Sequence, residues 1–257
     1  MSRKLSTRKR PDRNKHMIRE QLKVEEGVFE KRTMMAMWRM FNHNIVSRLD
    51  FIIAKGKEAD IYVADAGSEV NDSNVILKIF RVETSSFDKR IEYMLGDPRF
   101  EKIDRRNIYA VVTTWCRKEY GNLKIAEMAG IHAPLPFYFK DNILAEEFIS
   151  NDDMPAQTLK NTALENPANV LDTILEDLGK LYGAELVHGD ISEYNILIKG
   201  KTPYIIDFGQ AVVLGHPKAY SFLERDVYNI LYYFNKKYSI KRDLETTLAK
   251  IKSRHTE

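Results

Sequence analysis

Two short polar motifs, each beside an apolar run, constrain this chain more than any other feature of its sequence. The first motif, HGDISEYN, occupies residues 188–195, and the second, IIDFG, occupies residues 205–209. Short apolar runs bounded by polar residues indicate buried strands. Loops at the ends of such strands are held by the scaffold, so their polar side chains can converge. The two motifs therefore predict one site built from both.

The residue types in these motifs suit phosphoryl transfer. Asn195 follows Asp190 by five positions and Asp207 opens a D-F-G triplet, which is the order of the protein-kinase signature. Transfer of a γ-phosphoryl group requires an oriented acceptor hydroxyl and metal ions that neutralise the phosphate oxygens. We predict that Asp190 is the base and that Asn195 and Asp207 bind Mg²⁺ through oxygen. Either motif alone would be a weak match, but both occur in the required order.

Two charged residues upstream extend the pattern. Lys78 ends the apolar run at residues 75–78, and Glu119 lies on a helix expected at residues 111–129. We predict that Lys78 pairs with the phosphates of ATP and that Glu119 is its ion-pair partner. Taken alone, Lys78 would suit an edge strand and Glu119 a solvated helix face. The downstream motifs favour the functional interpretation.

Two further segments are assigned to ATP by their position in the chain. The loop before the second expected strand has one glycine, so its backbone is less free to surround phosphates than a glycine-rich loop. Its predicted nucleotide contacts are Gly56, Lys57, Glu58 and Ala59. The segment LAEEFI at residues 144–149 lies where a hinge would join two lobes. There the Glu147 carbonyl and the Ile149 amide are predicted to bind adenine.

The order of apolar runs predicts an α+β fold, with strands in the first half and helices in the second. Expected helices cover residues 24–48, 111–129, 167–186 and the region after 222; expected strands cover residues 51–53, 61–64, 75–80, 137–139, 143–148, 196–198 and 204–206. The charged stretch 81–109 is interpreted as a mobile insert with little structure at its centre. We predict a basic arm and N-terminal helix at 1–48, a β-rich lobe at 49–149 with a flexible insert at 83–108, and a short helical lobe at 150–257. A cleft between the lobes would hold the site.

Composition narrows the class of protein further. Hydrophobic residues make up 44% of the chain and charged residues 30%, which is typical of a globular body. No run approaches the ~18 apolar residues of a transmembrane helix, so we expect no membrane span. Cys116 is the only cysteine, and we expect it to be a small buried residue on a helix. Residues 1–19 hold eight basic residues and one acid, which suits a nucleic-acid-binding arm or a solvated tail equally.

These motifs resemble the RIO family of atypical protein kinases over most of the chain, residues 45–235. The resemblance rests on GKEADIY at 56–62, KEYGNLK at 118–124, EEFIS at 146–150, HGDISEYNIL at 188–197, IIDFGQAV at 205–212 and HPKAYSFLERD at 216–226. The GKEA loop is similar to that of the type-one branch. The chain departs from the family pattern at Ala54-Lys55, where a small hydroxyl pair usually precedes the glycine.

The resemblance implies a trimmed, two-lobed kinase fold with an extra N-terminal helix and an insert that covers the active site. It implies the use of ATP with Mg²⁺ or Mn²⁺, and autophosphorylation at Ser85 or Ser86. In members that act as ATPases, it implies an aspartyl-phosphate on the residue equivalent to Asp207. It further implies a cytoplasmic role in maturation of the small ribosomal subunit, with rRNA or the pre-ribosomal particle as the partner of the basic arm.

Two other functions stay open at this point, as does the oligomeric state. Small-molecule kinases of the aminoglycoside or choline type also carry an H-G-D…N and an I-D-F, although the segment 216–226 argues against them. A nucleotide-gated binding module would use ATP to set its conformation, with turnover incidental. The presence of Lys78, Asp190, Asn195 and Asp207 together favours an enzyme.

Overall fold

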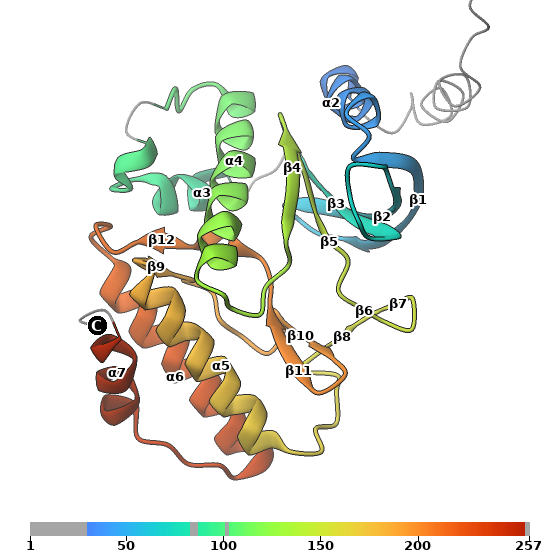
Figure 1. Ribbon diagram of the computed structural model, residues 1–257. Helices are drawn as coiled ribbons and strands as arrows, with labels where there is room; N and C mark the ends of the chain where they lie inside the picture. The colour runs from blue at the N-terminus through green and yellow to red at the C-terminus, as the bar shows by residue number, and fades with distance from the viewer. Residues whose placement is uncertain (1–29, 83–86, 101–102, 255–257) are drawn as a thin grey trace, which may run out of the picture.

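The computed structural model describes residues 30–82, 87–100 and 103–254. A β-rich part lies above a helical part, and the long helix α4 runs beside the sheet toward the junction (Figure 1). The helices are α2 (Lys31–Asn42), α3 (Phe87–Met94), α4 (Ile108–Met128), α5 (Pro167–Gly183), α6 (Ala219–Tyr238) and α7 (Leu244–Ser253), with short 3₁₀ turns η2 (Pro98–Phe100) and η3 (Phe208–Gln210). The strands are β1 (Val46–Lys55), β2 (Ala59–Ala66), β3 (Asn74–Phe80), β4 (Pro136–Lys140), β5 (Ile143–Glu147), β6 (Ser150–Asn151), β7 (Met154–Pro155), β8 (Gln157–Thr158), β9 (Leu186–Val187), β10 (Ile196–Lys199), β11 (Thr202–Ile205) and β12 (Val212–Val213).

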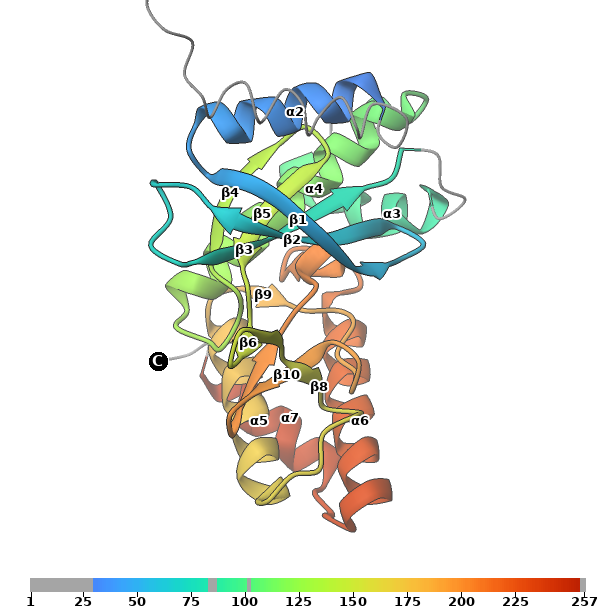
Figure 2. The same ribbon diagram turned by 90° about the vertical axis from the view of Figure 1, so that its right-hand side faces the viewer.

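The β-rich part is one antiparallel sheet in the order β1-β2-β3-β5-β4. Helix α2 lies across it at the edge farthest from the helical part (Figure 2). Met37 and Met40 of α2 join Leu77 and Ala145 of the sheet in one buried cluster. Successive residues of a strand point to opposite faces, so Lys78, next to Leu77, faces away from this cluster.

Helix α4 connects the sheet to the helical part. The side chain of Asn107 caps its first turn by accepting a hydrogen bond from the Ala110 amide at 3.1 Å, which satisfies one of the free amides at a helix start. Along the helix, Trp115 and Leu123 are buried in the core that also includes the helical part. Residues of α4 therefore contact both strand β4 and the turn η3.

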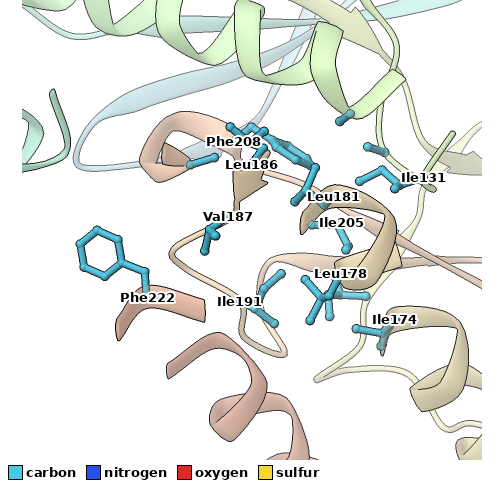
Figure 3. Packing of buried hydrophobic residues seen from close by; sticks show 14 of the residues in the cluster. Ile131, Ile174, Leu178, Leu181, Leu186, Val187, Ile191, Ile205, Phe208 and Phe222 are labelled. Carbon is cyan, nitrogen blue, oxygen red and sulfur yellow. The ribbon is translucent and has the colours of Figure 1, made fainter. Parts of the chain in front are cut away.

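The larger core fixes the two sequence motifs in place. Leu178 and Leu181 of α5 gather with Ile205 of β11 around the loop that carries Ile191 (Figure 3). Ile191 of the first motif and Phe208 of the second are both fully buried. These apolar anchors hold the backbone of each motif, so the polar residues beside them have defined positions.

The predicted elements are present, and most of the differences lie at their ends. The region after residue 222, expected to be helical, forms two helices, α6 and α7, with a break at residues 239–243, where Ser239 has a φ of 57°. The helix expected at 24–48 is α2, which ends at Asn42, while residues 46–48 belong to β1 and residues 24–29 lie outside the described residues. Asn44 turns the chain with a φ of 53°, and β-branched residues, which favour strands, follow at 45–46. The helix expected at 167–186 ends at Gly183, because Glu185 turns the chain with a φ of 61°.

The insert contains more secondary structure than the sequence predicted. Helix α3 and turn η2 occupy the centre of the stretch that was expected to be irregular. Tyr93 of α3 packs against the rings of Trp115 and Phe222 at centroid distances of 6.4 and 5.2 Å. The many charges of this stretch obscured the few apolar residues that attach it to the core. Ser85 and Ser86 lie outside the described residues, as does the basic arm, and the lobe boundaries at 48 and 149 stay predictions.

Two further expectations concern Cys116 and membrane-spanning helices. Cys116 is buried within α4, as predicted, and burial raises the pKa of its thiol well above the usual range. Over the ranges that the structure describes, the helices lack the combination of length and apolarity that crossing a bilayer demands.

Candidate active site

A cavity of about 510 Å³ lies between the sheet and the helical part. Ile61 and Ile76 line it from the sheet, residues 146–149 line it from the connection between the two parts, and Asn195 and Asp207 line it from the motif loops. A concave space with apolar walls and a few convergent polar groups is typical of a small-molecule site. The two sequence motifs therefore do meet, as predicted.

Lys78 joins Glu119 and Asp207 in one ion-pair network. Its Nζ lies 2.7 Å from Glu119 Oε1 and 2.8 Å from Asp207 Oδ1. The Glu119 side chain is 1% exposed, whereas that of Asp207 is 44% exposed and lines the cavity. The Lys78–Glu119 pair expected from the sequence is thus present, and Asp207 retains an accessible oxygen edge.

Burial and charge set the ionisation of this network. Burial opposes the charged form of Lys78, but the carboxylates of Asp207 and Glu119 raise its pKa well above the usual range. Burial raises the pKa of Glu119 to about 7, with Lys78 opposing this effect. Burial also acts on Asp207, yet the charge and hydrogen bond of Lys78 lower its pKa overall. Lys78 is therefore a cation and Asp207 an anion at neutral pH.

Asp190 is held by two amide donors. Asn195 Nδ2 donates to the Asp190 carbonyl at 2.9 Å and to its Oδ2 at 3.1 Å. Gln210 Nε2 donates to the same Oδ2 at 3.0 Å. Burial, followed by the charge of Asp207, raises the pKa of Asp190 to about 6. Gln210 was not predicted from the sequence, although its position directly after the D-F-G triplet could have indicated a place in the site.

Asp226 of α6 fixes the backbone on both sides of Asp190, a role that was not predicted from the sequence. Its carboxylate accepts hydrogen bonds from the Gly189 amide at 2.6 Å and the Ile191 amide at 2.9 Å. Burial raises its pKa to about 7, against the effect of these two donors. Gly189 has a φ of 79°, and a Cβ there would lie 3.1 Å from the Gln210 carbonyl oxygen. Both facts favour glycine at this position.

His188 links the two motifs. Its Nε2 lies 3.1 Å from the Ile206 carbonyl oxygen, and its Nδ1 lies 3.3 Å from the Asp190 amide. The amide must donate to Nδ1, so the proton of the neutral ring is on Nε2. Burial lowers the pKa of His188 to about 4. The ring is therefore neutral at physiological pH and serves as a structural link.

Lys118 of α4 binds the backbone that follows Asp207. Its Nζ donates to the carbonyl oxygens of Gly209 at 2.7 Å and Ala211 at 2.5 Å. The side chain is fully buried, and burial lowers its pKa to about 7. This role was not predicted from the sequence, because a lysine on a helix usually lies on a solvated face.

Asn122, one turn further along α4, completes this contact. Its Nδ2 donates to the carbonyl oxygens of Phe208 at 2.8 Å and Ala211 at 2.9 Å. Its Oδ1 accepts a hydrogen bond from Arg99 of η2 at 2.9 Å. Arg99 in turn pairs with the buried Asp97 at 2.7 Å. Helix α4 thereby connects the insert to the D-F-G segment.

The loop between β1 and β2 borders the same cavity. The Gly56 amide donates to the Ala59 carbonyl oxygen at 2.9 Å, and a Cβ on Gly56 would lie 2.7 Å from that oxygen. Glycine therefore permits this tight turn. All four residues that the sequence assigned to the nucleotide line the cavity: Gly56, Lys57, Glu58 and Ala59.

The connection between the sheet and the helical part lies at the cavity edge. Glu147 and Ile149 both line the cavity, as the prediction of adenine contacts requires. The Glu147 amide donates to the Leu135 carbonyl oxygen at 2.8 Å, and its side chain accepts a hydrogen bond from the Leu135 amide at 3.2 Å. The Ala156 amide donates to the Ile149 carbonyl oxygen at 3.0 Å. These bonds hold the connection in an extended form.

The donor set beside Lys78 fits Mg²⁺. Asn195 directs its Nδ2 to Asp190, which leaves its Oδ1 on the opposite side of the amide for a cation. Asp207 supplies an anionic oxygen. Within the described ranges, no group of three or more His, Cys, Asp and Glu side chains could hold a metal. Mg²⁺ commonly takes one or two protein oxygens and completes its shell with water and substrate phosphates, so two protein ligands suffice here.

Comparisons with known proteins agree with this geometry. The sequence matches the family model of the RIO domain over residues 60–247. The chain belongs to the RIO family. Among its RIO relatives, the RIO-type serine/threonine-protein kinase Rio1 of Haloferax volcanii is 37% identical over 217 residues, which cover 84% of this chain and 73% of that protein. The Rio1 of Methanocaldococcus jannaschii is 37% identical over 221 residues, covering 85% of this chain and 73% of that protein.

A solved RIO structure shows the same fold. The Rio2 kinase of Chaetomium thermophilum, in an ADP/Mg²⁺-phosphoaspartate complex, matches with a TM-score of 0.62 and 20% identity, covering 86% of this chain and 66% of that one. The trimmed kinase-like fold and the type-one assignment predicted from the sequence are confirmed, and the archaeal relatives support an archaeal-type RIO1 kinase. The chain is a serine/threonine-protein kinase of the RIO type, and its family implies the use of ATP and Mg²⁺.

Proposed function

We propose that this chain transfers the γ-phosphoryl group of ATP to a hydroxyl acceptor, with Asp190 as base and Asn195 and Asp207 as metal ligands. Support comes from one observation above all: Lys78, Asn195 and Asp207 line one cavity from three separate segments, and Asn195 is hydrogen-bonded to Asp190 in the same loop. Lys78 supplies a fixed cation for the phosphates. Asp190 is oriented by Asn195 and Gln210 and accepts the proton of the acceptor hydroxyl. Bound Mg²⁺ would neutralise the charge that develops on the phosphate oxygens.

The nucleotide would lie with its base at residues 147–149 and its phosphates toward Lys78. The Glu147 carbonyl and the Ile149 amide would bind adenine. The loop from Gly56 to Ala59 would cover the phosphates. Its single glycine limits how many backbone amides can approach them, so the side chains of Lys57 and Glu58 would take part.

We also propose an ATPase turnover at Asp207. A carboxylate oxygen would attack the γ-phosphorus as ADP leaves, and water would then cleave the acyl phosphate to inorganic phosphate and the free carboxylate. The exposed edge of Asp207 on the cavity side supports access to such a nucleophile. The family resemblance supports it as well, and the Rio2 kinase of Chaetomium thermophilum was solved as a phosphoaspartate complex.

The cellular role is proposed from the family resemblance. The chain would act in the cytoplasm on the maturing small ribosomal subunit, and the basic arm at residues 1–19 would bind rRNA.

Sedimentation with small-subunit particles tests this role. A variant with neutral residues in the arm should bind more weakly at low salt, and its binding should fall less steeply as the salt concentration increases. Equal binding by both proteins would contradict the role of the arm.

The reaction itself is tested by incubating the pure protein with γ-labelled ATP and either Mg²⁺ or Mn²⁺. Label on protein or in released phosphate should appear for the native chain and be lost in Asp190→Ala and Asp207→Asn. Asp172→Ala, an exposed residue of α5, is the matched control and should react normally. Binding of ATP by the native chain without transfer or hydrolysis would contradict the proposed reaction and favour a nucleotide-gated binding module.

A further inference from the structure

Glu146 is an acid on the inner wall of the cavity that the proposed chemistry does not use. It lies in β5, directly opposite Ile76 of β3 in the antiparallel register. Glu146, Ile76 and Lys78 all line the cavity, whereas Leu77 and Ala145 belong to the cluster under α2 on the other face. The Glu146 carboxyl therefore projects from the same face of the sheet as the Lys78 ammonium.

The positive charge near Glu146 is engaged with other carboxylates. Lys78 is the one cation among the groups that set the pKa of Glu146. That ammonium already lies 2.7 Å from Glu119 and 2.8 Å from Asp207. The ammonium of Lys78 is therefore already paired with two carboxylates other than Glu146. A carboxyl group in the wall of a confined cavity is stabilised most by a ligand that brings N–H donors to it.

The base of the proposed nucleotide brings such a donor. With adenine bound at Glu147 and Ile149, one hydrogen of its 6-amino group points to the Glu147 carbonyl. The second hydrogen, on the N7 edge, would then point into the cavity. Glu146 directly precedes Glu147 in β5 and lines this interior wall.

Either protonation state of Glu146 can accept that second hydrogen. Burial, followed by the charge of Glu119, raises the pKa of Glu146 to about 8. The ionised form accepts with a carboxylate oxygen. The neutral form accepts with its carbonyl oxygen and can donate its hydroxyl to N7, as an asparagine or glutamine amide does to the same edge of adenine. Guanine and hypoxanthine instead present two acceptors, O6 and N7, on this edge.

We propose, building on the function proposed above, that Glu146 selects adenine over 6-keto purines by accepting a hydrogen bond from the N7 side of the 6-amino group. Glu146 is then a specificity residue that contacts the base and takes no part in the transfer. The ligand class it favours is a purine nucleotide with an amino group at position 6.

The test compares the dissociation constants of ADP and IDP, each with Mg²⁺, by titration calorimetry. These nucleotides differ in the group at position 6 of the base and in the proton that hypoxanthine carries on N1, and they do not differ at position 2. In Glu146→Leu, the preference for ADP over IDP should fall by about tenfold, the size of one hydrogen bond to a confined polar group. In Glu146→Gln the preference should stay within about threefold of native, because the amide oxygen accepts the same hydrogen.

Glu127→Leu is the control, since Glu127 lies on the exposed side of α4 and pairs with Lys124. It should leave the ADP preference unchanged. If Glu146→Leu is folded, as judged by its unfolding curve, and keeps the native preference for ADP over IDP, the proposed selection by Glu146 is overturned while the proposed function stands. If the native chain bound neither nucleotide, the proposed function itself would fail, and the two failures are thereby distinguished.

Discussion

Lys78 is the residue at which the charges of the site are balanced. It is 11% exposed and bridges a buried carboxylate, Glu119, and an accessible one, Asp207. Its removal would leave Glu119 buried without its cation. Removing one partner of a buried ion pair strongly destabilises the folded state. We propose that the same ammonium binds the phosphates of ATP. Stability and nucleotide affinity should therefore depend on this one side chain.

We expect Lys78→Ala to lower the free energy of unfolding by about 3 kcal/mol and to weaken binding of MgATP by at least about tenfold. Urea unfolding and equilibrium titration measure the two effects. Lys124→Ala, a lysine on the exposed side of α4, should change neither. Native affinity in Lys78→Ala would show that another cation binds the phosphates.

His188 makes the stability of the chain depend on pH. The usual pKa of 6.5 applies to the unfolded state, and burial lowers the folded value to about 4. As the pH falls below 6.5, the unfolded chain therefore binds a proton that the folded chain does not. Stability is complete above this range and is lost progressively down to about pH 4, by roughly 3 kcal/mol in total.

The contribution of His188 is isolated by comparing the native chain with His188→Gln. Glutamine cannot bind a proton but keeps a donor for the Ile206 carbonyl. Urea unfolding between pH 7 and pH 4.5 should show a shallower loss of stability in the variant. Parallel curves for the two proteins would mean that His188 is not the group responsible.

At the scale of elements, helix α4 positions the D-F-G segment through Lys118 and Asn122. Together their side chains donate to carbonyl oxygens of three residues that follow Asp207. Backbone carbonyls in a buried turn need such donors. The orientation of Asp207 therefore depends on where α4 lies, and α4 is also bonded to the insert through Arg99.

Replacing Asn122 by Asp keeps the acceptor for Arg99 but removes both hydrogen bonds that its Nδ2 donates, to the carbonyl oxygens of Phe208 and Ala211. We expect this variant to lose about 2 kcal/mol of stability and to bind MgADP more weakly, because Asp207 would no longer be held. Thermal unfolding and titration measure these changes. Asn235→Asp, on the exposed side of α6, should behave as the native chain does. Unchanged MgADP affinity in Asn122→Asp would show that the turn does not need this contact.

The elements that the sequence predicted well are those with regular apolar spacing. The strands around Lys78 and Ile205 and the body of α4 were placed correctly for this reason. The ends of α2 and α5 were missed, because turns at Asn44 and Glu185 are set by local backbone conformation. Helix α3 was missed because only a few apolar residues, such as Tyr93, attach it to the core.

At the scale of the whole molecule, the cavity joins the sheet to the helical part. Its walls include Lys78 from the sheet and Asn195 and Asp207 from the helical part. A ligand that binds only the folded chain stabilises it, by about 2.7 kcal/mol at a free concentration of one hundred times its dissociation constant. We expect MgADP to do so, as measured by urea unfolding, and AMP at the same concentration to do so much less. No effect of MgADP would contradict binding across this cavity.

The sequence located the groups that we propose to act on ATP better than the groups that hold them in position. Asp190, Asn195 and Asp207 follow a spacing that chemistry imposes, so that spacing alone located them. Asp226 and Lys118 hold the loops from distant parts of the chain, and nothing in their local sequence indicates a partner. Such contacts depend on the tertiary fold, which periodicity and motif spacing do not specify.

The most direct test of the account separates nucleotide binding from chemistry in Asp190→Ala. Single-turnover transfer from γ-labelled ATP and the dissociation constant of MgATP should be measured on the same preparation. Because Lys78 and Asp207 remain in place, we predict an affinity within about threefold of native and a transfer rate lower by about 10²–10⁴. A transfer rate close to native would show that Asp190 is not the base and would contradict the proposed mechanism.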